Sequence, residues 1–227
     1  GVVSAELPAG FHRETFRVQA IAARTYAWYL RQTYGRKREW DLTATEKSQV
    51  YRGLERVVPH VAEAVADTRG IVCTWLSPQG EKIFCTYFSS RCGGTTAAAF
   101  NLGKDATIPP LIGGVACAYC RRADAYRWPQ DPELPKTLIG EQLADRYTRF
   151  AALGPIDDVE IIEATPDGRA LRLAVTDVDG RSMEIDGENF RLTVDPTGRL
   201  LQSTCFNITT QPDSILFTNG RGFGHGM

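Results

Sequence analysis

Hydrophobic and polar positions in the first third of the chain predict two helices. Residues 13–32 contain neither glycine nor proline, and their apolar side chains recur nearly all the way round a helix of about 3.6 residues per turn. This pattern predicts a long helix that is buried on most sides. A second helix is expected from Pro59, which suits a first helical turn, to Thr68, with Gly70 as its stop signal.

Two short apolar runs after the second helix predict a β-hairpin. They cover residues 71–76 and 82–88, and the residues between them include Pro78-Gln79-Gly80. A three-residue hairpin loop commonly ends in glycine, and this loop would place Cys73 opposite Cys85. Cysteines that face each other in a non-hydrogen-bonded pair are close enough for a disulfide, which would indicate a location outside the cytoplasm.

The rest of the chain predicts an irregular segment followed by a mixed helix and strand region. Residues 89–135 lack regular periodicity, and a loop of that length inside a domain usually carries function. A helix is expected near 137–150 and a last strand near 215–218. Between them, three alternating segments separated by glycine turns predict an antiparallel meander: residues 159–164, 170–176 and 181–185.

These elements predict an α+β fold in a single domain over residues 1–227. We expect the long buried helix to pack on antiparallel sheet, with a β-rich excursion around residues 155–205. No signal peptide opens the chain and it stops beside a glycine-rich run, so we expect both ends to be truncated.

Composition and charge limit the kinds of partner that the protein can be expected to bind. Of the 227 residues, 43% are hydrophobic and 23% are charged, which is typical of a globular protein and excludes bulk disorder. The 26 basic and 27 acidic side chains nearly cancel, which argues against nucleic acid as a partner. No stretch approaches the roughly 20 apolar residues of a membrane helix, so a membrane would be reached only through an anchor outside this chain.

The six cysteines include one Cys-x-x-Cys pair, Cys117 and Cys120. Three interpretations remain open for it: a redox pair, half of a metal site completed by Cys92 and Cys205, or cysteines in separate disulfides. A redox pair normally lies between a strand and a helix, whereas this one follows a glycine-rich loop. The redox interpretation is therefore the least favoured of the three.

Charged side chains stand out on and before the long helix. Arg17 and Arg24 are seven residues apart and so share one helix face, two turns apart. A buried arginine is either paired in a structural salt bridge or faces a polar cleft, and the sequence leaves both open. Glu6 is either a carboxylate at a helix entry, near the positive end of the helix dipole, or a functional acid.

The run from Gly220 to Gly226 alternates glycine with Arg221, Phe223 and His225. A dinucleotide-binding loop needs a strand before it and a helix after it, and the chain ends here. The alternation is more typical of backbone that approaches an extended ligand such as a sugar, with His225 as a donor or acceptor. A serine hydrolase is poorly supported, because the chain has three histidines and no Gly-x-Ser-x-Gly elbow.

Several stretches resemble, in order, the motifs of the SpoIID family, which comprises stage II sporulation protein D and the LytB-type amidase enhancers. Together they extend over nearly the whole chain, and the ordered set is more specific than any one member. The stretches are Glu6-Leu7-Pro8, residues 19–26, Ser48-Gln49-Val50-Tyr51-Arg52-Gly53, Thr68-Arg69-Gly70, Cys92-Gly93-Gly94-Thr95 and residues 220–226.

The resemblance implies a lytic transglycosylase. Such an enzyme cleaves the linkage between N-acetylmuramic acid (MurNAc) and N-acetylglucosamine (GlcNAc) in peptidoglycan strands, here strands without stem peptides, and leaves 1,6-anhydro-MurNAc ends. The resemblance assigns the role of catalytic acid and base to Glu6. One carboxylate suffices because the nucleophile, the C6 hydroxyl, belongs to the substrate itself. We expect apolar surroundings to keep Glu6 protonated until substrate arrives.

The family's substrate cleft maps onto the long helix at Arg17, Gln19 and Arg24. We expect the arginines to hold the free lactyl carboxylates of denuded strands rather than to contact Glu6. The full set of expected substrate-binding residues, gathered with Glu6 in one cleft, is Arg17, Gln19, Arg24, Tyr26, Ser48, Gln49, Tyr51, Gly93, Gly94, Thr95, Arg221 and His225.

The resemblance also bears on metal and partners. Some family members bind zinc near the Cys-Gly-Gly segment, and here Cys92, Cys117 and Cys120 would hold a structural zinc, although the chemistry requires no cofactor. Ser89 stands where many members have a histidine. The implied partners are peptidoglycan glycan strands and a cell-wall amidase, at an extracytoplasmic location. The alternative function is a non-catalytic glycan-binding module that stimulates an amidase.

Overall fold

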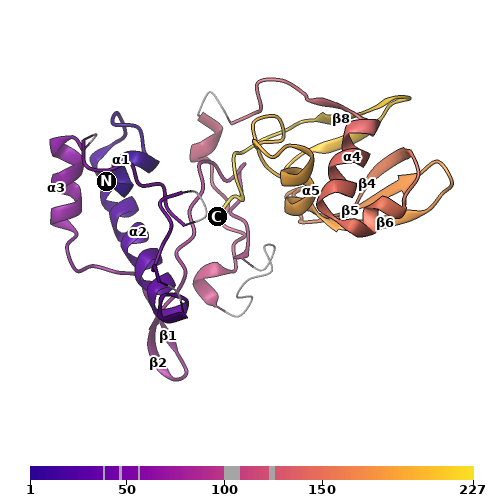
Figure 1. Cartoon of the computed structure of the whole chain (residues 1–227). Helices are drawn as coiled ribbons and strands as arrows, with labels where there is room; N and C mark the ends of the chain where they lie inside the picture. Colours follow the sequence, from indigo (N-terminus) through magenta and orange to yellow (C-terminus); the bar gives the residue numbers. More distant parts are fainter. Residues whose placement is uncertain (38, 46–47, 56, 100–107, 123–125) are drawn as a thin grey trace. The chain divides into compact units, whose positions relative to one another are not determined.

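The computed structural model describes every residue except 38, 46–47, 56, 100–107 and 123–125, so parts of the predicted irregular segment lie outside the described residues. The contacts divide the chain into two compact units, Gly1–Phe88 and Ser89–Met227, where the sequence predicts one domain (Figure 1). Helices and antiparallel sheets make up the fold, so the predicted α+β class is confirmed. Among the described helices, none has the length and apolar character needed to cross a membrane.

The first unit is mainly helical. Its elements are α1 (Val2–Glu6), α2 (Arg13–Thr33), a 3-10 turn η1 (Gly35–Lys37), α3 (Pro59–Asp67), β1 (Thr74–Ser77) and β2 (Gly80–Ile83). Helix α2 begins where predicted, because His12 is extended and its Nδ1 accepts a hydrogen bond from the Glu14 backbone N–H. Helix α3 begins at Pro59, also as predicted.

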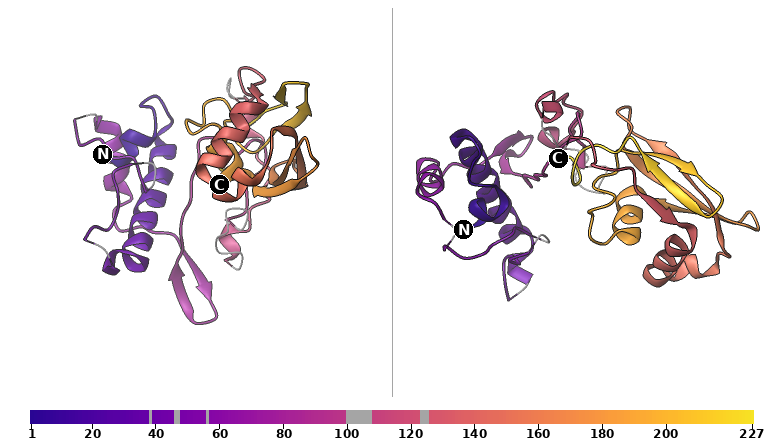
Figure 2. Two further views of the ribbon diagram at one scale, coloured as in Figure 1. Left: turned by 45° about the vertical axis from the view of Figure 1, so that its right-hand side comes forward. Right: turned by 90° about the horizontal axis from the view of Figure 1, so that it is seen from above.

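The small core of the first unit joins its three helices. Phe16 and Ala20 of α2 pack with Val3 of α1 and with Val61 and Ala64 of α3. Figures 1 and 2 show α3 beside α2, consistent with this shared core. Residues 16 and 20 are one turn apart, so they present a single apolar stripe to both neighbours.

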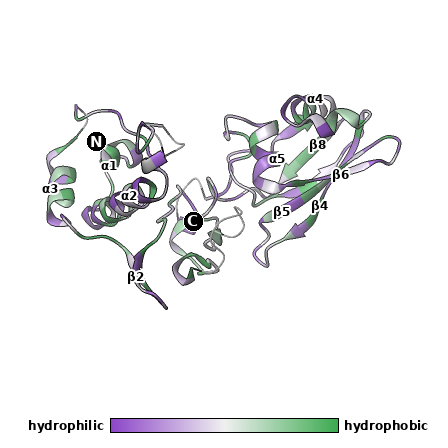
Figure 3. Ribbon diagram, turned by 60° about the horizontal axis from the view of Figure 1, so that its bottom comes forward, coloured by the Kyte–Doolittle hydropathy of each residue, from purple (hydrophilic) through white to green (hydrophobic). Residues whose placement is uncertain are grey.

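The long helix is less enclosed than its composition predicts. Val18 is 66% exposed and Trp28 is 45% exposed, so the prediction of burial on most sides is wrong. Within the unit, α2 packs against α1 and α3 rather than on a sheet. Hydrophobic and hydrophilic residues follow one another along α2 in Figure 3, and periodicity alone does not show which apolar positions have a partner.

The β1–β2 hairpin forms, but its register differs by one residue from the prediction. Ser77 pairs with Gly80, so the loop contains two residues, Pro78 and Gln79, instead of three. Gly80 has φ +107° and lies within the strand pairing. A shift of one residue removes the predicted opposition of Cys73 and Cys85, and neither cysteine forms a disulfide.

The second unit contains two three-stranded antiparallel sheets. One has the order β3 (Glu133–Pro135), β8 (Ser214–Thr218), β7 (Asn207–Thr210), and the other is the meander β4 (Ile156–Ala164), β5 (Ala170–Asp177), β6 (Ser182–Asp186). The helical elements are η3 (Pro109–Leu111), η4 (Tyr119–Arg122), α4 (Lys136–Arg146), η5 (Thr148–Ala152) and α5 (Gly187–Val194). The predicted meander and last strand are confirmed.

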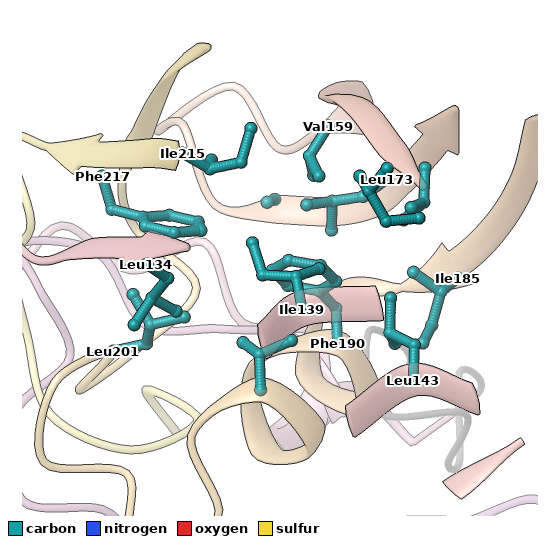
Figure 4. Packing of buried hydrophobic residues seen from close by; sticks show 14 of the residues in the cluster. Leu134, Ile139, Leu143, Val159, Leu173, Ile185, Phe190, Leu201, Ile215 and Phe217 are labelled. Atoms are coloured by element: carbon teal, nitrogen blue, oxygen red, sulfur yellow. The ribbon is translucent and has the colours of Figure 1, made fainter. Parts of the chain in front are cut away.

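One hydrophobic core holds the helices and sheets of the second unit together. Figure 4 shows Ile139 of α4 and Phe190 of α5 directed toward Val159 and Leu173 of the meander and Phe217 of β8. Helix α5 is absent from the sequence prediction. It begins directly after β6, where the Asp186 carboxylate accepts hydrogen bonds from two backbone N–H groups of its first turn.

Candidate functional site

Glu6 is the last residue of α1, and its carboxylate is half-buried and fixed at one end. Its Oε1 accepts a hydrogen bond from the Val50 backbone N–H at 2.8 Å. Leu7 is extended, so the chain leaves the helix directly after Glu6. Among the described residues, Oε2 has no hydrogen-bond partner, and the carboxylate has no ion-pair partner. One oxygen is therefore anchored and the other is available for proton transfer.

The loop that contains Val50 is held against α2 by its neighbours. Gln49 is buried, and its side-chain amide donates to the Ala23 carbonyl of α2 at 2.9 Å. The Ser48 hydroxyl accepts from the Thr43 backbone N–H at 3.1 Å, within the same loop. Gln49, predicted to contact substrate, thus fixes the segment that supplies the Glu6 hydrogen bond. Tyr51 remains exposed beside this segment.

Arg17, predicted to face substrate, is ion-paired within the first unit. Its guanidinium donates to Glu14 at 2.9 Å and to Asp67 of α3 at 2.5 Å, and Arg13 contacts the same Asp67 carboxylate at 2.9 Å. The hydrogen bond from Arg17, followed by that from Arg13, holds the pKa of Asp67 below its ordinary value. The salt-bridge alternative therefore describes Arg17.

Arg24 also joins α2 to α3. It donates to the carbonyl oxygens of Ile71 at 2.8 Å and Val65 at 3.4 Å, and to the Thr68 hydroxyl at 3.4 Å. These groups lie at and beyond the C-terminal end of α3, where a cation is favoured. Arg24 is not paired with Glu6. Its guanidinium group donates hydrogen bonds to carbonyl groups of the protein and is therefore not free to bind a ligand.

The ionic contact between the helices predicts a pH dependence of stability. A carboxyl group whose pKa is lower in the folded protein stabilises it above the unfolded pKa, about 3.9 for aspartate, and this contribution is lost as pH falls through the folded pKa. Asp67→Asn should therefore lower the free energy of unfolding at pH 7 and have less effect near pH 2. Urea denaturation at the two pH values measures this, and an equal loss at both would contradict it.

Three buried polar atoms in the first unit lack a partner among the described residues: the Gln19 side-chain nitrogen and Arg17 Nε on α2, and the Ser4 hydroxyl on α1. Such atoms are uncommon in native proteins and mark positions where water or a ligand group would bind. Tyr26 packs edge-on against Tyr87 and Phe88, with ring centroids 6.3 and 6.2 Å away. Burial raises the pKa of Tyr26 to about 12, so its hydroxyl stays protonated at neutral pH.

In the second unit, the terminal glycines allow two backbone segments to pack together. Arg91 and Phe223 exchange hydrogen bonds of 3.2 and 3.0 Å. A Cβ on Gly222, where φ is +82°, would lie 2.9 Å from the Gly93 nitrogen, and one on Gly220 would overlap Trp128 at 2.0 Å. The interpretation of this run as backbone facing an extended ligand is therefore corrected for these positions, which face the protein's own chain.

Gly222→Ala is expected to destabilise the second unit by about 1–3 kcal/mol, since it adds both a strained left-handed backbone and a contact with Gly93. Gly114→Ala is the matched control, because Gly114 also has positive φ but a Cβ there would meet nothing within 4 Å. Thermal or urea unfolding of the two variants separates the steric contribution from the conformational one. Equal losses would show that the close approach to Gly93 costs nothing.

The packing of these segments forms a cavity of about 610 Å³ within the second unit. Its walls include four residues that the sequence assigns to substrate binding: Gly93, Gly94, Thr95 and Arg221. His225 is not among its lining residues, and the His225 Nδ1 accepts from the Met227 backbone N–H. Sequence reasoning missed Arg121, Arg127, Asn207 and Asn219, which also line the cavity and come from separate segments.

Three thiols meet beside this cavity. The Sγ atoms of Cys92 and Cys120 are 3.5 Å apart, those of Cys117 and Cys120 are 3.9 Å apart, and all three lie within 4.8 Å of one another. Zinc–sulfur bonds of about 2.3 Å in a tetrahedron place sulfurs about 3.8 Å apart, so the cluster fits three zinc ligands. Burial raises the pKa of Cys92 to about 12, whereas a backbone hydrogen bond from Cys120 lowers the pKa of Cys117.

The remaining cysteine of the predicted ligand set lies apart from this cluster. Cys205 is buried, and among the described residues only Cys92, Cys117 and Cys120 have ligand atoms close enough together to share a metal ion. All six cysteines lie among the described residues, and none of the predicted disulfides is formed.

Comparison with known proteins assigns each unit separately. Residues 1–75 match a family model described as stage II sporulation protein (SpoIID), and residues 89–227 match one described as a domain of unknown function (DUF8618). No solved structure matches the chain.

Two curated relatives match the whole chain. It is 33% identical over 230 residues to an uncharacterized protein of Brachyspira hyodysenteriae, covering 56% of that protein. It is 26% identical over 243 residues to Stage II sporulation protein D of Bacillus amyloliquefaciens, covering 63% of that protein. The chain thus spans less than two thirds of either relative.

The SpoIID match associates the first unit with a family of cell-wall-related proteins. The chain belongs to the SpoIID family through its first unit, and its second unit belongs to DUF8618.

Proposed function

We propose that this protein is a peptidoglycan lytic transglycosylase with Glu6 as its single acid and base. The substrate is the MurNAc–GlcNAc linkage of glycan strands that lack stem peptides, and the product carries 1,6-anhydro-MurNAc ends. The observation that carries the proposal is the state of the Glu6 carboxylate, which is half-buried, held at one oxygen by Val50 and not ion-paired among the described residues.

The hydrogen bond from Val50 decides which Glu6 oxygen carries the proton. An N–H donor favours an oxygen with a free lone pair, so Oε1 accepts from Val50 and the proton resides on Oε2. Oε2 then gives its proton to the bridging oxygen as the bond from C1 of MurNAc to that oxygen breaks. The Val50 N–H stabilises the carboxylate that forms.

The same carboxylate completes the reaction by removing a proton. It takes the proton of the C6 hydroxyl while O6 bonds to C1, which closes the anhydro ring and regenerates protonated Glu6. No water is consumed, and the attacking oxygen is already tethered to the reacting carbon. A well-oriented intramolecular attack lowers the barrier by up to about 7–11 kcal/mol relative to a bimolecular one.

Zinc at Cys92, Cys117 and Cys120 would be structural in this scheme. Cys92 directly precedes Gly93, and Cys120 directly precedes Arg121, so a metal that joins these thiols would hold two parts of the cavity wall. When bound, zinc supplies cross-linking of two chain segments rather than a chemical step.

The location follows from the substrate. Peptidoglycan lies outside the cytoplasmic membrane, so the proposal places this domain there, with a cell-wall amidase that strips stem peptides as the expected partner. The alternative is a glycan-binding module that stimulates such an amidase without cleaving. The polar cavity of the second unit favours this alternative, because binding there would not need Glu6.

Product analysis separates these functions. Denuded glycan strands are incubated with the protein and the products are examined by mass spectrometry. Anhydro-MurNAc ends support the transglycosylase, and ends heavier by one water indicate a hydrolase. Binding of the strands without any product supports the glycan-binding module.

A further inference from the structure

The cavity of the second unit is unusually rich in arginine. Arg121, Arg127 and Arg221 line it, against a single acidic residue, Asp167. Its volume of about 610 Å³ is within the range of small-molecule sites. The surplus of cations indicates that the complementary ligand is an anion.

Two of these arginines are placed opposite each other at the closest cross-strand position. Arg127 and Arg221 form an antiparallel bridge. The flanking hydrogen bonds join Gly222 to Tyr126 at 2.8 Å and Trp128 to Gly220 at 2.9 Å, so the two arginines are a non-hydrogen-bonded pair, whose side chains approach most closely. Like charges at directly opposed positions are destabilising, and an anion between them would remove that cost.

The three guanidinium groups differ in whether the protein already supplies their hydrogen-bond partners. Arg221 donates to the Gly93 carbonyl at 3.1 Å and also to the Asp167 carbonyl, so it is fixed in place as part of the wall. Arg121 and Arg127 are exposed, and their side chains have no hydrogen-bond or ion-pair partner among the described residues. Arg221 thus supplies a fixed charge, and the other two have forks available for a ligand.

Neutral polar side chains complete the wall. Asn207 begins β7 and pairs with Thr218, so Asn219, the residue after Thr218, lies at the same end of this strand pair. Asn219 has φ +55° and is the one described non-glycine residue with positive φ. Side-chain amides donate to and accept from hydroxyl groups, as sugar recognition requires.

We propose that this cavity binds the carboxylate of an acidic sugar, with Arg121 and Arg127 as the groups that recognise it. The choice of sugar rests on the proposed function. In denuded glycan strands the carboxylate would be the free lactyl group of MurNAc, and the amides of Asn207 and Asn219 would face sugar hydroxyls. Arginine suits this role because its planar fork matches a carboxylate with two hydrogen bonds.

The test compares two sugars that differ by the lactyl group. N-acetylmuramic acid and N-acetylglucosamine are titrated into the full chain and followed by NMR chemical shifts; neither contains a glycosidic bond that the protein could cleave. We expect N-acetylmuramic acid to bind at least tenfold more tightly, and Arg121→Gln and Arg127→Gln each to weaken it about tenfold. Its affinity should also fall with added salt.

A matched control lies beside Arg121. Arg122 is exposed in the same 3-10 turn but does not line the cavity, so Arg122→Gln should bind like the wild type. Equal affinity for the two sugars would overturn the proposal, as would unchanged binding in both cavity variants. Equally tight binding of inorganic phosphate would show that the site does not select carboxylates and would overturn it too.

The proposed carboxylate site and the proposed enzymatic activity can be refuted independently of each other. Glu6→Gln is expected to retain wild-type affinity for N-acetylmuramic acid. A protein that yields no cleavage product but discriminates the two sugars would retain the carboxylate site and refute the enzyme. A protein that cleaves strands but binds both sugars alike would retain the enzyme and refute this site.

Discussion

Glu6→Gln is expected to lower the rate of glycan-strand cleavage by about 10²–10⁴-fold, the usual contribution of a positioned acid and base. This corresponds to about 2.7–5.4 kcal/mol of transition-state stabilisation. Glutamine has the same shape, and its carbonyl oxygen still accepts from the Val50 N–H, so the loop contact at 2.8 Å is preserved. Only proton donation and removal are lost. Release of anhydro-MurNAc ends, measured by mass spectrometry, gives the rate.

Glu63→Gln is the matched control for this experiment. Glu63 is an exposed carboxylate on α3 whose contact with Arg13 is a distant 3.9 Å, so its removal changes charge without touching the Glu6 contact. Its cleavage rate should equal that of the wild type. If Glu6→Gln retained the wild-type rate while folding normally, Glu6 would not be the acid, and a binding function would become the better account.

Local signals in the sequence predicted the starts of helices α2 and α3, although not helix α5. The start of α3 at Pro59 and the start of α2 at Arg13 follow from capping and propensity, which depend on a few neighbouring residues. The hairpin register was not predictable to one residue, because two- and three-residue loops both suit the Pro78-Gln79-Gly80 sequence. That single residue decided whether Cys73 would face Cys85.

The arrangement of the candidate site could be predicted only where its residues belong to one segment of the chain. The position of Glu6 next to α2 was apparent, but its hydrogen bond to Val50 joins residues 44 positions apart. Periodicity correctly placed Arg17 and Arg24 on a common helix face, yet it could not show that α3 would meet that face with Asp67 and a set of carbonyl groups.

The cavity of the second unit was even less predictable from local sequence. Arg121, Arg127 and Arg221 occur in different segments, and no spacing rule relates them. Their convergence depends on the bridge between Arg127 and Arg221 and on the packing of the glycine run against Gly93. Tertiary contacts of this kind are not encoded in local pattern.

Cys120→Ser is expected to abolish zinc binding and to lower the thermal stability of the second unit markedly. Cys120 is the central thiol of the cluster, 3.5 Å from Cys92 and 3.9 Å from Cys117, so its loss leaves two ligands for a metal that requires four. Structural zinc contributes folding free energy directly, about 10–16 kcal/mol in isolated zinc-finger peptides, and less is expected where a core also supports the fold. Metal analysis after reconstitution with zinc in reducing buffer gives the stoichiometry.

Cys73→Ser is the control for this prediction, since Cys73 is a half-buried free thiol in the first unit, outside the cluster. Wild type and Cys73→Ser should each hold one zinc per chain, and Cys120→Ser none. Chelation should lower the unfolding temperature of the first two and leave that of Cys120→Ser unchanged. A wild-type protein that binds no zinc under these conditions would refute the metal site.

Chelation should also weaken N-acetylmuramic acid binding, because Cys120 directly precedes Arg121 in the chain. A single peptide bond thus links the thiol cluster to the cavity of the second unit.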